Sequence, residues 1–458
     1  MNGYRRRGVS FGTVFMLLLT IVVAGSCIVV LPRLAGNMDQ RLDAQQLADA
    51  ITGSLDLPAL TLSEIPIFPK PAAEVKAGES AQGGVPSAMA ALGQAQVTGT
   101  PEPSATQPPA RRAFTLSVAG TISFDGGIRK SGYHSESKTY DFSGILSVIG
   151  QEFDGDISLA TLENTLVDNG KLNEVNTTKD VLGDLAVSGL DMLSLGHEHI
   201  LDLGFAGLQE TAAAVSMAGF SVLGVKTDRQ DTQSALVMDV QGVRVAFLHY
   251  SELISNAGKK AAKTDDCAFA LPAYQPEAVA ADIQAARAQG AQVVIVLMHW
   301  GTDEQTKVTS AMKQKAQAIA NAGADMIFGA HGKVALPIEY LTGTRVDGTN
   351  HPALVCYSLG GLLTSSRNTP NIAGMILKLQ IGFDQTAGMV SFDKVEFVPT
   401  YIWRLKENGQ YVYQVIPSDR PAPETMDENQ RGVMQRALER INKLLAESPA
   451  KPRAGGGN

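Results

Sequence analysis

The sequence predicts an α/β fold for the larger part of the chain, residues 113–402. Apolar segments of strand length alternate with longer segments of helical periodicity, which is the pattern of a sheet covered by helices. One strand segment, residues 293–298, is apolar at every position, as expected for a strand that is covered on both faces. Histidines directly follow several of the predicted strands. These observations favour one large globular domain whose chemistry lies at one edge of its sheet.

The predicted elements alternate along the whole domain. Strands are predicted at residues 114–121, 157–162, 191–195, 220–225, 235–240, 243–250, 293–298, 325–328, 353–357, 371–381 and 388–398, and helices at 142–151, 207–218, 276–289 and 307–322. Residues 403–458 are predicted to be a polar C-terminal extension. Its one charged amphipathic helix, at residues 424–446, is interpreted as a surface helix or a stalk.

The N-terminal segment predicts a membrane anchor. Residues 1–10 contain three arginines, and residues 11–31 follow without a charge, a run long enough to cross a bilayer as a helix. The basic flank is expected to stay in the cytoplasm, so that the C-terminal domain lies outside the cell membrane on a single-pass anchor. A cleaved signal peptide, disfavoured by the length of the run, and lipidation at Cys27, disfavoured by a poor lipobox, are the alternatives.

Residues 32–112 are expected to connect the anchor to the domain. Residues 40–60 could form an amphipathic stalk, and residues 66–112 are rich in Ala, Pro, Gly, Gln and Ser with few large apolar side chains. Such a composition cannot bury enough apolar surface to offset the entropy of ordering the chain. We therefore expect a disordered linker that holds the domain away from the membrane.

Composition and cysteine usage exclude some classes of function. Hydrophobic residues make up 44% of the chain, enough for a substantial core, and the net charge of -8 argues against a nucleic-acid partner. A single apolar segment of membrane-spanning length argues against a channel or transporter. Cys27, Cys267 and Cys356 lack the spacing of a metal site and allow at most one disulfide.

One segment, residues 194–204, lies between a predicted strand and a predicted helix. Its sequence is Ser-Leu-Gly-His-Glu-His-Ile-Leu-Asp-Leu-Gly. In an extended segment, His197 and His199 would point to the same side and could face one ion while Glu198 turns away. Two satisfied imidazoles beside a turn are the alternative interpretation, since an imidazole binds metal only where other ligands converge.

Other possible ligands do recur at strand ends. The residues that directly follow predicted strands are Glu163, His197, His199, His299 and His331. Independent core histidines have no reason to recur at the same end of successive strands, whereas a metal site at a sheet edge requires it. Imidazoles with a carboxylate suit zinc, manganese or iron better than calcium or magnesium. We expect Asp202 to orient His199, and interpret His134, His249 and His351 as structural or surface residues.

At these residues the chain resembles the CapA family, the poly-γ-glutamate capsule synthesis proteins, whose domain is related to the calcineurin-like metallophosphatases. The similarity runs from about residue 114 to residue 401. The family motifs appear, in order, as Thr-Leu-Glu at 161–163, Gly-His-Glu-His-Ile-Leu-Asp-Leu-Gly at 196–204, His-Trp-Gly at 299–301, Gly-Ala-His-Gly-Lys at 329–333 and Tyr-Ser-Leu-Gly-Gly-Leu at 357–362. The resemblance implies a metallophosphatase-like layered α/β sandwich.

The residues at these motifs suggest a division of roles. Metal ligands are expected at Glu163, His199, His299 and His331. His197 and Glu198 are the expected acid or base. Asn164, Asp202 and Lys333 are expected beside the metal or the substrate.

The chain also departs from the family pattern. Thr121 stands where the family has Asp, the pair His197-Glu198 where it has Asn-Asn, Lys333 where it has His, and Gly361 where it has Asn. A two-metal centre needs bridging and terminal ligands, so these changes should remove one or both metal positions. Asp125 is near enough in sequence to replace the missing carboxylate, although it follows the turn. Lys333 could instead bind a phosphate or a carboxylate directly.

Two functions are consistent with these residues. In the first, the domain is a metal-dependent hydrolase that acts in the synthesis, export or attachment of a poly-γ-glutamate-like capsule or envelope polymer. In the second, it is a non-catalytic member that binds an anionic envelope polymer or a partner such as the polymer's synthase complex. A fold alone does not decide between catalysis and binding.

Overall fold

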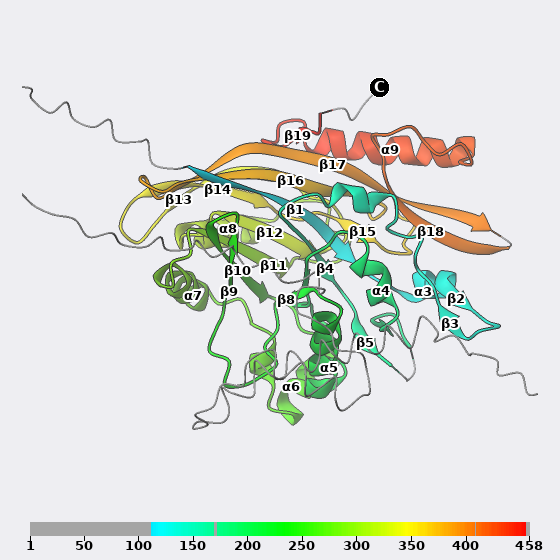
Figure 1. Cartoon of the computed structure of the whole chain (residues 1–458), viewed down its shortest axis with the longest axis horizontal. Coiled ribbons are helices and arrows are strands. Elements are labelled where there is room, and N and C mark those ends of the chain that lie inside the picture. The colour runs from blue at the N-terminus through cyan, green and yellow to red at the C-terminus, as the bar shows by residue number, and fades with distance from the viewer. Residues whose placement is uncertain (1–110, 169–171, 408, 455–458) are drawn as a thin grey trace, which may run out of the picture. The chain divides into compact units, whose positions relative to one another are not determined.

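The computed structural model describes residues 111–168, 172–407 and 409–454, which contain two large β-sheets (Figure 1). The predicted tail, the anchor and nearly all of the predicted linker lie outside these ranges. The larger sheet has the order β18 (Gln410–Pro417), β17 (Met389–Glu407), β16 (Ala373–Asp384), β1 (Arg112–Ile122), β4 (Ile157–Leu162), β7 (Met192–Ser194) and β8 (Ser221–Leu223). Two short strands extend it, β15 (Gly361–Leu363) beside β1 and β19 (Lys451–Pro452) beside β17.

The smaller sheet has the order β13 (Ile338–Thr344), β14 (Asn350–Cys356), β12 (Met326–His331), β11 (Val293–Trp300), β10 (Val243–Ser251) and β9 (Leu236–Val240). Its strands β10, β11, β12 and β14 are parallel to their neighbours in that series. Two further strand pairs lie apart from both sheets, β2 (Tyr133–His134) with β3 (Thr139–Tyr140) and β5 (Thr165–Val167) with β6 (Asn176–Thr178).

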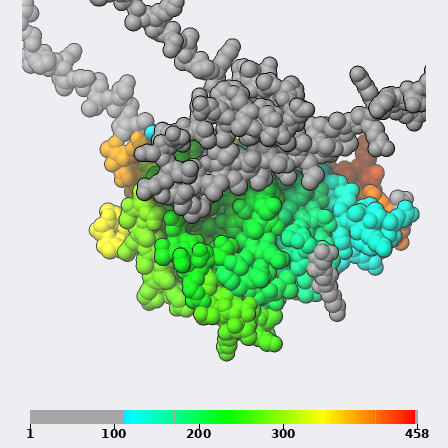
Figure 2. Space-filling model, turned by 60° about the horizontal axis from the view of Figure 1, so that its bottom comes forward, coloured from blue at the N-terminus to red at the C-terminus, as the bar shows by residue number. Residues whose placement is uncertain are grey.

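Helices cover the outer faces of the sheets. The long helices are α5 (Gly204–Met217), α7 (Pro276–Ala288), α8 (Ser310–Asn321) and α9 (Glu428–Leu444), and the short ones are α3 (Gly126–Gly132), α4 (Val181–Ala186), α6 (Asn256–Thr264), η2 (Ile149–Glu152) and η3 (Ala268–Ala270). Helix α9 packs on β16 and β17, whereas α7 packs on β11 and α8 on β12 and β13. Helices α5 and α6 lie on the side that Figure 2 brings forward, where green residues dominate the coloured surface.

Strand β11 shows why its sequence is continuously apolar. Val293, Ile295 and Leu297 belong to the core between the sheets, whereas the alternate residues Val294 and Val296 belong to a second core under α7 and α8. Both faces of the strand are therefore buried, as the sequence predicts. Full burial of one such side chain contributes roughly 1.5–3 kcal/mol to stability, so an apolar residue is favoured at every position.

The predicted helix at residues 142–151 is wrong. This segment forms turns that end in the short 3₁₀-helix η2. Side chains take the backbone donors that a helix would use, because Asp184 accepts from the Phe142 N–H at 2.9 Å and Asp141 accepts from the Ser143 N–H at 2.9 Å. Ser143 and the glycines of this segment also have low helix propensity.

Residues 403–407 and 409–454 pack against the same core as the rest of the domain. The domain boundary that the sequence predicts at residue 402 falls inside β17. This strand continues to Glu407 and pairs with β18. Helix α9 occupies the predicted helical segment and buries Met434, Ala437 and Ile441. Because these side chains face β16 and β17, α9 is one layer of the fold (Figure 1).

Two smaller findings concern membrane helices and thiols. Across residues 111–454, in the parts that are described, no helix combines the length and the hydropathy needed to cross a bilayer. Cys267 and Cys356 are buried free thiols, and Cys27 lies outside the described residues.

Candidate metal site

The predicted ligands come from the carboxyl ends of strands in both sheets. Glu163 directly follows β4, and residues 197–199 follow β7, which is parallel to β4 in the larger sheet. His299 and His331 lie near or at the ends of β11 and β12, which are parallel neighbours in the smaller sheet. The edge at which parallel strands end therefore gathers these residues, but it is formed by two sheets instead of one.

Glu198 is the residue to which the histidines converge. Its carboxylate contacts His299 Nε2, and its Oε1 atom lies 3.3 Å from His331 Nδ1 and 3.6 Å from His199 Nε2. The expectation that Glu198 turns away is wrong because residues 197–203 form successive turns, with the Ile200 N–H donating to the His197 carbonyl at 3.2 Å. The alternation of side chains in an extended strand does not apply to such a segment.

Three of these residues fit one metal ion. Glu198, His299 and His331 each offer a ligand atom, and these atoms lie within 4.8 Å of one another. His299 is fully buried and His331 nearly so, and the Nδ1 atom of His299 lacks a hydrogen-bond partner among the described residues. Two imidazoles and a carboxylate are ligands that zinc, manganese and iron accept. The group can therefore hold one transition metal.

His199 lies at the rim of this group and is oriented by Asp202. Its Nδ1 atom is 2.8 Å from Asp202 Oδ2, as expected from the sequence. Asp202 also accepts a hydrogen bond from Ser255, the residue that caps α6. The hydrogen bond to Asp202 raises the pKa of His199, although burial opposes it. His199 is thus held in one orientation, with about a quarter of its side chain exposed.

Glu163 has a different partner from the other predicted ligands. Its Oε1 atom is 3.2 Å from Lys333 Nζ, and its side chain is almost fully buried. His331 and Lys333, on either side of Gly332, both have positive φ, of 104° and 54°. Such backbone conformations cost of order 1–3 kcal/mol for residues with a side chain, and they cluster at functional sites. The turn aims one side chain at Glu198 and the other at Glu163.

Burial and charge determine the protonation of the group. Burial raises the pKa of Glu198, but hydrogen bonds and charge from His299 and His331 outweigh it, and the pKa lies well below its ordinary value. Burial lowers the pKa of His331, but Glu198, Glu163 and Asp303 hold it above its usual 6.5. Glu198 is therefore a carboxylate, and a metal competes with a proton for His331.

His197 and His249 are buried at the base of the site. Burial lowers the pKa of His197 well below its ordinary value and that of His249 to about 3, so both are neutral. His249 Nδ1 is 2.9 Å from Ser194 Oγ, and its Nε2 donates to the Gly196 carbonyl at 2.6 Å. The structural interpretation of His249 is confirmed. Its supporting role was not apparent from the sequence because His249 lies inside a strand, away from the other histidines.

The chain matches a family of bacterial capsule synthesis proteins. The family model described as "Bacterial capsule synthesis protein PGA_cap" matches residues 115–366, more than half of the chain. The chain belongs to this family. The match spans the strands and turns that carry Glu198, His299 and His331, so the candidate site lies inside the PGA_cap region.

Curated relatives of this PGA_cap protein have capsule-related names. The PGA biosynthesis protein CapA of Bacillus subtilis is 25% identical over 269 residues, 58% of this chain and 61% of that protein. The capsule biosynthesis protein CapA of Bacillus anthracis is 24% identical over 252 residues, 53% of this chain and 52% of that protein. The chain therefore spans about half to three-fifths of the length of these relatives.

The solved structures to which this chain is similar include a nucleotidase and a phosphoesterase. The NAD nucleotidase (NadN) of Haemophilus influenzae has a TM-score of 0.39 at 12% identity, over 74% of this chain and 67% of that chain. The calcineurin-like phosphoesterase YfkN of Bacillus subtilis has a TM-score of 0.37 at 12% identity, over 74% of this chain and 100% of that chain.

The departures of this PGA_cap protein from its family pattern have structural counterparts. Thr121 is buried, and its hydroxyl lacks a partner among the described residues. Asp125 does not replace the missing carboxylate, because it caps α3 and accepts from the Ser365 N–H at 2.7 Å. Asn164 accepts from the Phe124 N–H at 2.7 Å, so its amide oxygen holds a turn.

Proposed function

We propose that this PGA_cap protein acts in the synthesis, export or attachment of an anionic envelope polymer, as a hydrolase that uses one metal ion. The observation that carries the proposal is the convergence of Glu198, His299 and His331, which have ligand atoms within 4.8 Å of one another. Family membership supports the link to capsule polymer. The sequence of residues 11–31 supports an anchored location outside the cell membrane.

The residues of the site would have the following roles. Glu198, His299 and His331 hold the metal, which when bound polarises a phosphoryl or amide oxygen and activates water. His199 is the best-placed acid, because it is partly exposed, its Nδ1–H is held by Asp202 and that hydrogen bond raises its pKa above the usual 6.5. His197, which the sequence suggested as acid or base, is fully buried and supports the 197–199 turn.

Binding without catalysis is the second candidate, and one observation favours it. Lys333 places an ammonium group 3.2 Å from Glu163, so part of the site already holds a positive charge. A site with one permanent cation can bind an anionic polymer without hydrolysing it. The two candidates differ in turnover but agree on the class of ligand.

Metal content of the full chain, purified in detergent, tests the proposal. The matched variants are Glu198→Gln, which removes a charged ligand at similar volume, and His351→Gln, which changes a buried histidine that bonds the Ala324 carbonyl instead. We expect about one equivalent of zinc, manganese or iron in the parent and in H351Q, and a loss of at least tenfold in affinity in E198Q.

Turnover then separates the two candidates. The parent and E198Q are assayed with poly-γ-glutamate and with a phosphodiester, and released products are quantified. Hydrolysis by the parent alone supports the enzyme. A parent that binds metal and polymer but releases no product supports the binding role. A parent that stays empty after incubation with zinc and manganese rejects the metal-dependent hydrolase.

A further inference from the structure

The pair Glu163 and Lys333 forms a second half of the site, distinct from the Glu198 group. Glu163 is 5% exposed, and a carboxylate buried to this degree requires a positive partner. The partner here is the Lys333 ammonium, with Nζ 3.2 Å from Glu163 Oε1. The negative charge of Glu163 is thus neutralised by a residue of the chain itself. A metal ion is not needed to neutralise it.

Lys333 keeps donors beyond the one used by Glu163. An ammonium group has three N–H donors and no acceptor. Among the described residues, Lys333 forms an ion pair with Glu163 alone. A quarter of the lysine side chain is exposed. The remaining donors can therefore reach a ligand, while the carboxylate holds the ammonium in place.

The two halves are joined by one short turn. His331 belongs to the metal-binding group and Lys333 to the ion pair, and both have the positive φ values that set their directions. The turn places a fixed organic cation next to the metal position. A ligand with two oxygens could contact both, one at each half.

We propose that Lys333 takes the place of a second metal ion and binds an oxyanion of the ligand, while the chain holds a single metal at Glu198, His299 and His331. The statement about the metal rests on the proposed function. The statement about the oxyanion does not, because neither Glu163 nor Lys333 belongs to the group that would hold the metal. The ligand group is a carboxylate or a phosphate, since an ammonium point charge binds either.

The rival interpretation is a second metal ion at Glu163. Glu163 Oε2 is buried and lacks a hydrogen-bond partner among the described residues, and a cation is one group that could satisfy it. A divalent ion there would lie beside the Lys333 ammonium, and the two like charges would repel. Metal stoichiometry decides between the interpretations.

Anion binding to the full chain in detergent tests the proposal by calorimetry. The probes are inorganic phosphate and glutarate, each added to EDTA-treated protein and to protein with one equivalent of zinc. The variants are Lys333→Gln, Lys333→Arg and, as the matched control, Lys313→Gln, because Lys313 is an exposed lysine that pairs with Glu339.

The expected result is a Lys333-dependent affinity. K333Q should weaken binding of at least one probe tenfold or more in the EDTA-treated protein, whereas K333R and K313Q should stay within about threefold of the parent. The probe that binds identifies a carboxylate or a phosphate as the ligand group. Equal affinities in the parent and K333Q, or no binding of either probe to the parent, would overturn the oxyanion role.

Zinc titration of the same proteins gives the stoichiometry. One equivalent in the parent and in Glu163→Gln is expected, whereas two equivalents in the parent would overturn the replacement of a metal by Lys333. A parent that binds no zinc but binds an anion through Lys333 rejects the hydrolase and retains the oxyanion site. The two failures are therefore distinguishable.

Discussion

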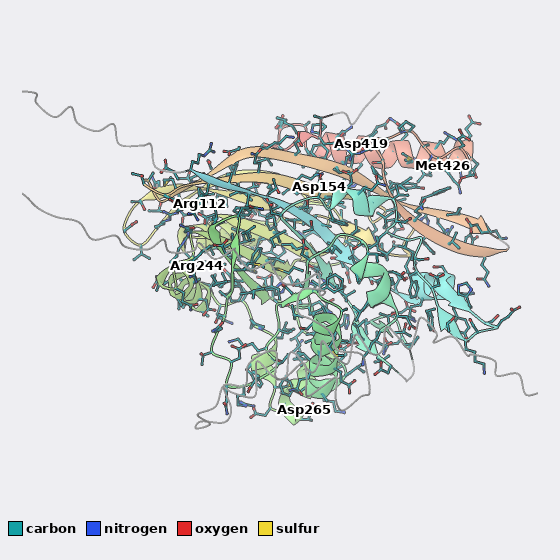
Figure 3. All side chains as sticks on the ribbon, viewed as in Figure 1. Arg112, Asp154, Arg244, Asp265, Asp419 and Met426 are labelled. Carbon is teal, nitrogen blue, oxygen red and sulfur yellow. The ribbon has the colours of Figure 1, made fainter. Side chains whose placement is uncertain are left out.

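Two buried charge clusters in this molecule differ in how well their polar atoms are satisfied. In the C-terminal cluster, Glu152 contacts Arg453 and Arg420, and Arg453 binds Asp419 with two hydrogen bonds, of 3.1 and 2.9 Å. Asp419 lies near α9 in Figure 3. In the candidate metal site, buried nitrogens of His197 and His299 lack partners among the described residues.

The difference separates a structural role from a functional one. A satisfied cluster joins segments distant in sequence, here the residue after β19, the turn after β18 and η2. An unsatisfied cluster costs stability unless something binds to it. Burial and charge are common to the two clusters, so the unpaired atoms are what distinguishes them.

The largest effect is expected when the satisfied cluster is broken. Arg453→Met should lower the free energy of unfolding by about 3–5 kcal/mol, because it leaves Asp419 and Glu152 as buried carboxylates short of a partner. Chemical denaturation measures the loss. Arg420→Met is the matched control, since Arg420 is 57% exposed and should cost at most about 1 kcal/mol. Equal losses in the two variants would contradict the comparison.

A smaller effect is expected from pH. The lowered pKa of Glu198 stabilises the metal-free protein at pH values above 4.5, which is the pKa of this residue in the unfolded state. This contribution to stability is lost as pH falls through the pKa of Glu198 in the folded state. The raised pKa of His331 stabilises the metal-free protein fully below pH 6.5, the pKa of this residue in the unfolded state. This contribution to stability is lost as pH rises through the pKa of His331 in the folded state. The two contributions are therefore both present between pH 4.5 and 6.5.

The affinity for metal should rise with pH, whereas the contribution of His331 to stability falls. A proton must leave His331 before the metal binds, so zinc affinity should rise with pH by up to about tenfold per unit below the pKa of His331. Competition with a chromogenic chelator from pH 5.5 to 8 measures it. His331→Gln should flatten the profile, and an unchanged slope in that variant would assign the proton to another group.

A smaller loss of stability is expected at the metal-free site. Glu198→Gln should lower the free energy of unfolding in EDTA by about 1.5–3 kcal/mol, less than Arg453→Met, because an amide of similar volume replaces the charged hydrogen bond to His299 by a neutral one. Thermal denaturation beside the Arg453→Met variant measures it. A loss as large as that of Arg453→Met would show that the Glu198 group holds the fold together.

The sequence predicts which strand ends carry the site but not which side chains meet. His299 and His331 are predictable because apolar parallel strands bring their carboxyl ends to one edge. The central position of Glu198 is not, because it depends on turns at residues 197–203. Pairing of Glu163 with Lys333 depends on a positive φ at Lys333, which no residue type there signals.

The fold is predictable to a similar degree. The strands that are buried at every position, such as β4 and β11, are correctly placed. Strands β13 and β18 were not predicted, since each mixes polar and apolar residues and owes its pairing to a neighbouring strand. Helix α6 was not predicted either, because it is rich in lysine and buries only Gly258.

The position of β1 has a consequence for biosynthesis. This first strand of the domain lies between β4 and β16, with Phe114 opposite Ile381. A ribosome adds about 5–20 residues per second, so β1 waits on the order of tens of seconds for β16 to emerge. During that interval one apolar edge of the nascent sheet is open to wrong partners. The pairing of β1 is therefore completed only after β16 has been made.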